Sequence, residues 1–180
     1  DFEGTVVCAG TDGSGISLQQ SSITKGTPDE WELIDRTFNV STPYGDRRVS
    51  IALYKAVMKQ GEYAINSNNS INCYIFLPNN YSVYKILNPA VYSSTAKFSL
   101  SESFDGLVVC ASHNGGGVNL GSHSFSSGTP DRWVLLEHII NAYSGNADRK
   151  VTIAIYDAKL PAGDYTISSN NNINCYMLIK

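Results

Sequence analysis

The sequence is poor in charge, and it has neither a basic surface nor a long apolar run. Only 16% of its 180 residues are charged, and the formal net charge is −3. A protein that binds a phosphate backbone normally presents clustered Lys and Arg, which this composition does not offer. No apolar stretch approaches the roughly 18–20 residues needed to span a bilayer. We therefore expect neither a nucleic-acid partner nor insertion into a membrane.

The sequence also has little of what catalysis or metal binding requires. The three histidines are His113, His123 and His138, and the equivalent positions of the internal repeat described below hold other residues. No nucleophile elbow, Walker loop or HExxH is present, and no CxxC spacing suggests zinc. The paired carboxylates fall in turns, where Asp is common for backbone hydrogen bonding. We expect no enzyme, no cofactor and no metal site.

An internal repeat dominates the sequence. Phe2–Ala9 matches Phe104–Ala111, and Gly-Thr-Pro-Asp-x-Trp occurs at both Gly26–Trp31 and Gly128–Trp133. The offset is 102 residues throughout and needs no gap, with about 34 of 76 aligned positions identical. Repeats of this kind indicate one structural unit used twice. We expect two modules, residues 1–88 and 89–180.

Period-two alternation of apolar and polar residues predicts strands rather than helices. Val151, Ile153 and Ile155 would face one side, and Ala154 and Tyr156 the other. Residues 133–141 lack clean alternation and could form a short helix, but their β-branched pair favours a strand. Short strands between Gly-, Asn- and Pro-rich turns are typical of an all-β sandwich, with jelly-roll or immunoglobulin-like layering. The predicted strands of the second copy are 105–112, 117–125, 132–141, 149–157, 163–169 and 173–179.

The segment between the copies has no counterpart in the first one. It contains two strand-like pieces, Tyr81–Leu87 and Lys97–Ser101, and the second leads directly into the second copy. Nothing comparable precedes Phe2. We expect either that the protein continues upstream of Asp1 or that another segment occupies that sheet edge, since exposed edges promote unwanted pairing.

Four cysteines occur at matched positions of the repeat. Their alternation with neighbouring apolar residues points them inward, and the repeat favours the pairs Cys8–Cys73 and Cys110–Cys175. A bridge closing about 65 residues would contribute roughly 4 kcal/mol on the chain-entropy model. The alternative is that all four are buried, reduced thiols packed as small apolar residues.

Two places could bind a ligand. Trp31 and Trp133 lie two residues after an Asp and could stack on a sugar ring, or they could open a strand and cap the core. The second place is the loop end, because an up-and-down path brings the loops at 10–15, 41–46 and 66–70 together. Amides there suit hydroxyl-rich ligands, although Asn is also common in turns for conformational reasons. The loop residues are Asp12, Asp46, Asn68 and Asn69 in the first copy and Asn114, Asp148, Asn170 and Asn171 in the second.

The segment Ala162–Ser169, following Val151–Tyr156, resembles the terminal β-modules of bacteriophage tail or head fibres, as do the low charge and the abundant Ser, Asn and Gly. The resemblance implies a virion or extracellular protein that recognises a glycan or cell-surface receptor, with homo-oligomers (trimers in a fibre). The resemblance does not identify any binding residue in this sequence. The alternatives are a structural or capsid-decoration protein and a secreted tandem-repeat lectin.

Overall fold

In the computed structural model every described element is a β-strand. The model describes residues 1–11, 23–38, 49–66, 71–89, 93–113, 125–140, 151–169 and 173–180. The all-β class expected from the alternation is therefore confirmed. For residues 133–141 a helix was the alternative; residues 133–140 belong to a strand, Arg132–Ile140, and residue 141 lies outside the described residues.

The strands occur at matching positions of the repeat. The first part of the chain contains β1 (Phe2–Thr11), β2 (Ile23–Lys25), β3 (Glu30–Phe38), β4 (Val49–Met58), β5 (Ala64–Ile65) and β6 (Ile71–Leu77). The strands 102 residues further on are β9 (Phe104–His113), β10 (Phe125–Ser127), β11 (Arg132–Ile140), β12 (Val151–Leu160), β13 (Gly163–Ser168) and β14 (Ile173–Ile179). Between them lie β7 (Ser82–Leu87) and β8 (Thr95–Leu100).

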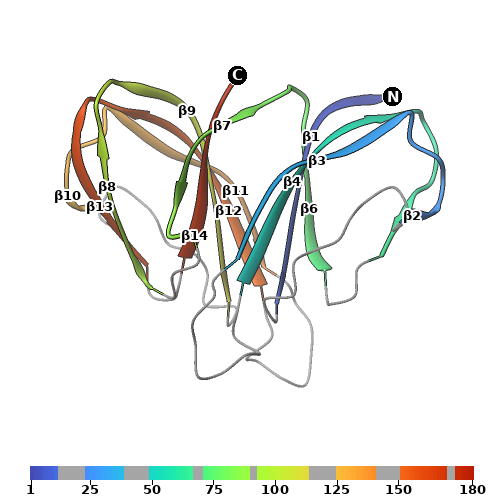
Figure 1. Ribbon diagram of the computed structural model, residues 1–180, viewed down its shortest axis with the longest axis horizontal. Helices are drawn as coiled ribbons and strands as arrows, with labels where there is room; N and C mark the ends of the chain where they lie inside the picture. The colour runs from blue at the N-terminus through green and yellow to red at the C-terminus, as the bar shows by residue number, and fades with distance from the viewer. Residues whose placement is uncertain are drawn as a thin grey trace.

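Antiparallel pairing assembles these strands into two large and two small sheets (Figure 1). The large sheets have the orders β3-β4-β1-β6 and β11-β12-β9-β14-β7, so the second follows the first and adds β7 at its edge. The small sheets are β2-β5 and β10-β13-β8, and here too the second has one more strand. The two additional strands are those that the sequence places between the copies.

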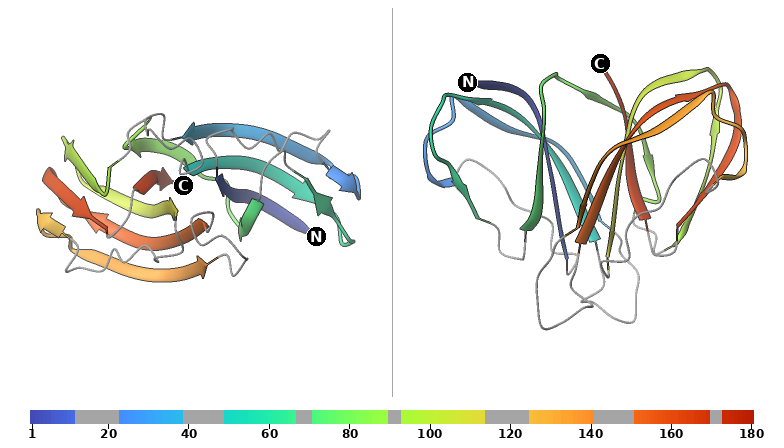
Figure 2. Two further views of the ribbon diagram at one scale, coloured as in Figure 1. Left: turned by 90° about the horizontal axis from the view of Figure 1, so that it is seen from below. Right: turned by 180° about the vertical axis from the view of Figure 1, so that it is seen from behind.

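The four sheets stack so that the inner strands of each large sheet, such as β1 and β4 in the first and β9 and β12 in the second, are buried on both faces. Val7 and Leu53 of the first large sheet pack against Val109 and Ile153 of the second, and this interlayer core joins the two halves of the molecule. The opposite faces of the large sheets pack under the small ones, in two further cores. Seen from below, the two large sheets lie face to face at the centre (Figure 2). Both faces of β12 carry apolar side chains for this reason: Ile153 and Ile155 lie in the interlayer core, and Ala154 and Tyr156 lie in the core beneath the small sheet.

One strand from before the boundary expected near residue 88 pairs within the second large sheet. β7 precedes that boundary, yet it is hydrogen-bonded to β14, with Leu87 opposite Cys175. The segment Tyr81–Leu87 thus contributes to the second large sheet. The interlayer core further means that the two copies share buried apolar surface.

The Gly-Thr-Pro-Asp turns take the same conformation in both copies. Gly26 and Gly128 have φ angles of +80° and +79°, a region that favours glycine. A Cβ atom at either position would also overlap the ring of Tyr63 or Tyr165. Both the backbone angle and the close approach of a tyrosine therefore require glycine at the start of this turn.

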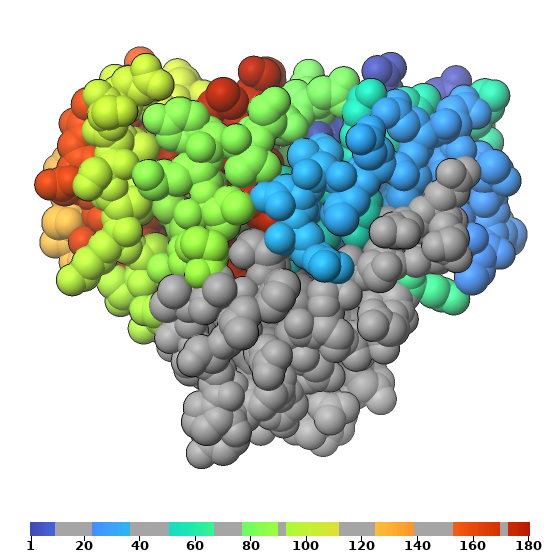
Figure 3. Space-filling view, viewed as in Figure 1, coloured from blue at the N-terminus to red at the C-terminus, as the bar shows by residue number. Residues whose placement is uncertain are grey.

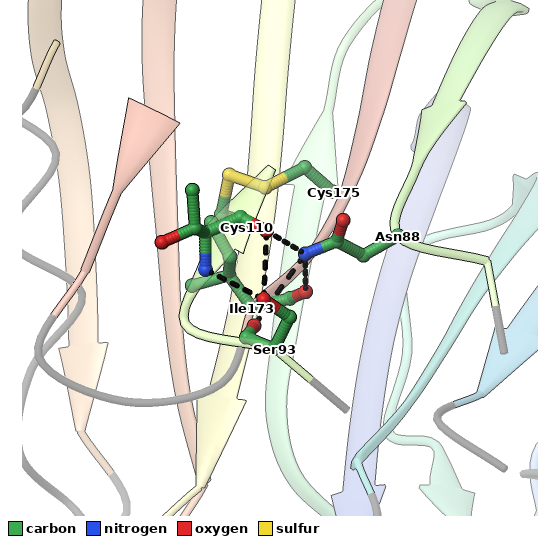
Figure 4. Close-up of a disulfide and its surroundings, with 6 residues drawn as sticks. Asn88, Ser93, Cys110, Ile173 and Cys175 are labelled. Carbon is green, nitrogen blue, oxygen red and sulfur yellow. Dashed lines mark hydrogen bonds between the residues drawn. A yellow bond between two sulfur atoms is a disulfide. The ribbon is translucent and has the colours of Figure 1, made fainter. Parts of the chain in front are cut away.

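A disulfide joins the central strands of the second copy. Cys110 and Cys175 lie directly opposite each other on β9 and β14, as the repeat-based pairing predicts, and their Sγ atoms are bonded (Figure 4). Beside them, the Asn88 side-chain amide donates hydrogen bonds to the carbonyls of Thr95 and Ile173, both at 3.1 Å. The end of β7 is thereby attached to the beginnings of β8 and β14.

The corresponding pair in the first copy differs in register. A β-bulge between Ala9 and Gly10 places Cys73 opposite Ala9, one position away from Cys8. Cys8 is buried, while the side chain of Cys73 lies outside the described residues. The Cys8–Cys73 bridge therefore stays a prediction.

Candidate functional site

The described strand ends of the first copy converge where the polar loops begin and end. Thr11, the last residue of β1, pairs with Val49 at the start of β4, and Gly10 pairs with Ile71 at the start of β6. Phe38 at the end of β3 lies opposite Ser50. These strand ends therefore meet at one end of the sheet, although the strand order β3-β4-β1-β6 contains crossovers and is not the simple up-and-down path from which a shared end was expected.

The second copy repeats this arrangement at the same end of the molecule. His113 pairs with Val151, and Ser112 pairs with Ile173. In Figures 1 and 2 the ends of β1 and β9 point the same way, whereas the N- and C-termini lie at the opposite end. We call the end that carries these strand ends the loop-bearing end. The two termini and the loop-bearing end thus lie at opposite ends of the molecule.

The eight candidate polar residues of the loops lie outside the described residues. These residues are Asp12, Asp46, Asn68, Asn69, Asn114, Asp148, Asn170 and Asn171.

The two tryptophans pack in the cores rather than forming exposed platforms. Trp31 is 8% exposed, and its ring stacks on Tyr54 with centroids 5.1 Å apart. Trp133 is half-buried, stacks on Tyr156 at 4.6 Å and meets Phe125 edge-on. These contacts favour the core-packing interpretation, most clearly for Trp31, whose side chain is almost fully buried.

Equivalent positions of the two copies form an ion pair, but the cation and the carboxylate are on exchanged strands. Lys55 on β4 bonds Glu30 on β3 at 2.8 Å, and this hydrogen bond, together with the carboxylate charge, raises the pKa of Lys55. In the second copy the cation is on the other strand: Arg132 on β11 contacts Asp157 at 2.8 Å and Asp105 at 2.5 Å. The exchanged charges preserve pairing between neighbouring strands at an exposed surface, where such pairs align strands and contribute little stability.

Two hollows are lined by described residues that the sequence did not single out. A groove of about 530 Å³ on the first copy is lined chiefly by Phe2, Met58, Tyr63 and Ile65. A second hollow, of about 510 Å³, lies between β3 and β7, which are neighbours on the face shown in Figure 3. The sequence did contain a sign of the groove on the first copy, because the strand-like piece Lys97–Ser101 has no counterpart in that copy.

Within the described ranges, no group of three or more His, Cys, Asp or Glu is placed to hold a metal ion. His138 is exposed on β11. None of the described segments forms a helix long and apolar enough to cross a membrane.

Comparison with known proteins identified no similar protein. The chain matches no family model, and neither the curated proteins nor the solved structures yield a match.

Proposed function

We propose that this protein is a non-catalytic surface-recognition protein that binds a glycan or another hydroxyl-rich receptor through its loop-bearing end. The observation that carries the proposal is the convergence of strand ends from both copies at one end, opposite the two termini. Loops on a rigid β scaffold are common binding sites, because the scaffold holds them while their sequences vary.

The chemistry of the loop residues fits a hydroxyl-rich ligand. Side-chain amides both donate and accept hydrogen bonds, and carboxylates accept bidentate bonds from neighbouring hydroxyls. Each copy contributes one carboxylate-and-amide set, with Asp12 in the first copy replaced by Asn114 in the second. Two modest sites on one rigid body gain avidity without additional contacts.

The setting that suits this arrangement is the tip of a fibre on a virion, with the termini toward the shaft and the loops toward the host surface. The Cys110–Cys175 disulfide equally suits a secreted lectin, since disulfides persist in oxidising surroundings. Both settings use the same loop-bearing end.

A glycan array tests the proposal directly. The unmodified chain should bind a restricted set of glycans, and Asn68→Ala/Asn69→Ala combined with Asn170→Ala/Asn171→Ala should abolish binding. Changing one copy only should weaken apparent binding about 100-fold or more, because avidity is lost. Gln60→Ala, an exposed change at the opposite end, is the control. Failure of every glycan class, or loss of binding only in the control, would refute the proposal.

One observation favours a second candidate, a structural or decoration protein. Val134, Leu135 and Leu136 are 50%, 49% and 55% exposed on β11, an edge strand among the described sheets. Exposed apolar edges promote association with other chains. If this stripe is an assembly surface, the unmodified chain should show a concentration-dependent mass by light scattering, and Leu136→Lys should abolish it.

A further inference from the structure

A strand of the second copy covers an apolar surface that the first copy leaves partly open. In β8, the side chains of Ala96, Phe98 and Leu100 point inward and are 1%, 8% and 5% exposed. They belong to one core with Phe104, Leu160, Tyr165 and Ile167, and Phe98 stacks on Tyr165 with ring centroids 5.5 Å apart. Beneath β8, these four residues are at most 3% exposed.

The equivalent residues of the first copy form the groove of about 530 Å³. Subtracting the repeat offset of 102 from those four positions gives Phe2, Met58, Tyr63 and Ile65, all of which line it. Met58 is 6% exposed, but Phe2, Tyr63 and Ile65 are only partly buried, unlike their counterparts. The surface that β8 covers in one copy is thus hollow and apolar in the other.

The neighbouring strand is also shorter where β8 has no counterpart. β13 runs from Gly163 to Ser168 and pairs with β8 along its whole length, from Gly163 opposite Leu100 to Ser168 opposite Thr95. Its equivalent, β5, comprises only Ala64–Ile65. The tyrosine is held alike in both, since Tyr63 donates a hydrogen bond to Lys59 and Tyr165 donates one to Pro161. The wall of the site is therefore already in place in the first copy.

We propose that the groove on the first copy binds a β-strand of the β8 type, donated by polypeptide outside residues 1–180. The strand would run antiparallel to the 61–66 segment and alternate polar and apolar side chains, with an aromatic residue opposite Tyr63 as Phe98 is opposite Tyr165. Strand addition of this kind combines main-chain hydrogen bonds with pockets for alternate side chains.

The polar side of the site supports the same occupant. In the second copy the Ser99 hydroxyl donates a 2.5 Å hydrogen bond to Asp164. The equivalent of Asp164 is Glu62, which is exposed and paired with Lys25. A donated strand with a hydroxyl at the position of Ser99 would find a carboxylate acceptor there, so both faces of such a strand have matching partners.

A peptide of residues 93–103 is the direct probe, added to the unmodified chain and followed by calorimetric titration. It should bind one equivalent, and Phe98→Asp in the peptide should weaken binding about tenfold or more, because a buried aromatic side chain is lost. The matched control is Lys97→Gln, which changes an outward-facing residue of the same strand. Equal binding of all three peptides, or of none, would overturn the proposal.

A fused strand gives a second, independent readout. Because Ser103 aligns with Asp1, residues 81–102 placed directly before Asp1 put the strand in register with the first copy. The fusion should raise Tm by about 5 °C or more and should no longer bind the free peptide. The same fusion carrying Phe98→Asp in the added segment is its control. An unchanged Tm with continued peptide binding would overturn the proposal, as would self-association of the unmodified chain through this groove. Loss of glycan binding in either experiment is not expected, since Asp1 and Phe2 of the groove lie at the N-terminus, which is at the end opposite the loop-bearing end (Figure 1).

Discussion

Cys110 and Cys175 face each other across β9 and β14, with their Cα atoms 4.1 Å apart, and a disulfide joins them although 65 residues separate them in sequence. The bridge ties the two central strands of the second large sheet, within the core that β8 completes. It links the first and last strands of the second copy, so it closes nearly the whole unit.

Removing this bridge should destabilise the protein. A Cys110→Ala/Cys175→Ala variant should lose about 4 kcal/mol of unfolding free energy, because the unfolded chain is no longer constrained by a loop of this length. Chemical denaturation followed by circular dichroism measures the loss. Reduction of the unmodified chain should reproduce at least this effect. Equal stability of the variant and the unmodified protein would show that the bridge does not form in solution.

The tryptophans should matter for stability and not for ligand binding. Trp31→Ala should cost about 3–5 kcal/mol, because it removes a buried ring stacked on Tyr54 and leaves a cavity. Trp31→Phe should cost less, since it keeps an aromatic ring there. Binding to any glycan found on the array should be unchanged by Trp31→Phe, measured where the protein is folded. If Trp31→Phe lost glycan binding without losing stability, the Gly26–Trp31 turn would again be a candidate binding site.

The interlayer core should make both copies unfold together. Leu53→Ala, in the first copy, should cost about 2–5 kcal/mol, because Leu53 is fully buried against the second large sheet. With Trp31→Phe or Trp133→Phe as background, the remaining tryptophan reports on one copy at a time. Both reporters should shift to the same lower denaturant midpoint. Val134→Ala, at an exposed position, is the control and should change little. Two separate transitions, only one of them shifted, would contradict a shared core.

Tyr176 should make stability fall at alkaline pH. Burial, followed by the proximity of Asp35 on β3, raises the pKa of Tyr176 above the ordinary value of 10.0. A tyrosine whose pKa is raised on folding contributes fully below its unfolded pKa, and this contribution is lost as pH rises above about 10 toward the folded value. The unmodified protein should therefore lose stability more steeply above pH 10 than Tyr176→Phe. Tyr81→Phe, at a partly exposed tyrosine, should follow the unmodified protein. Identical slopes for Tyr176→Phe and the unmodified protein would contradict this.

Much of the local structure could be predicted from the sequence. Alternation located the longer strands, as β12 and β13 illustrate, because a strand has a period of two and its turns need Gly, Asn or Pro at defined places. It did not locate β10, which begins at Phe125 where the predicted strand 117–125 ends; residues 117–124 lie outside the described residues. The repeat placed Cys110 with Cys175, since equivalent positions must occupy equivalent strands. A shared end for the loop-flanking strand ends was also expected, although from a simple up-and-down path that the strand order does not follow.

What the alternation could not distinguish is which apolar layer each face of a strand meets. Ile153 and Tyr156 point to opposite sides of β12, one to the interlayer core and the other to the core beneath β8. The sequence pattern of such a strand is the same whether its second apolar face packs against another copy or a ligand. Apolar side chains indicate that the face is buried, but not which surface buries it. For the same reason Trp31 was compatible with a surface platform until its stacking on Tyr54 was seen.

By itself, the sequence of this protein determined its strands, its turns, its internal repeat and the polar character of its loops, because these depend on local conformational preference and on side-chain period. The tertiary structure alone decided that the two large sheets share a core, that β7 belongs with β14, and that β8 fills in one copy what remains a groove in the other. These features depend on pairing and packing between segments distant in sequence, where free energy comes from surfaces that meet only in the folded chain.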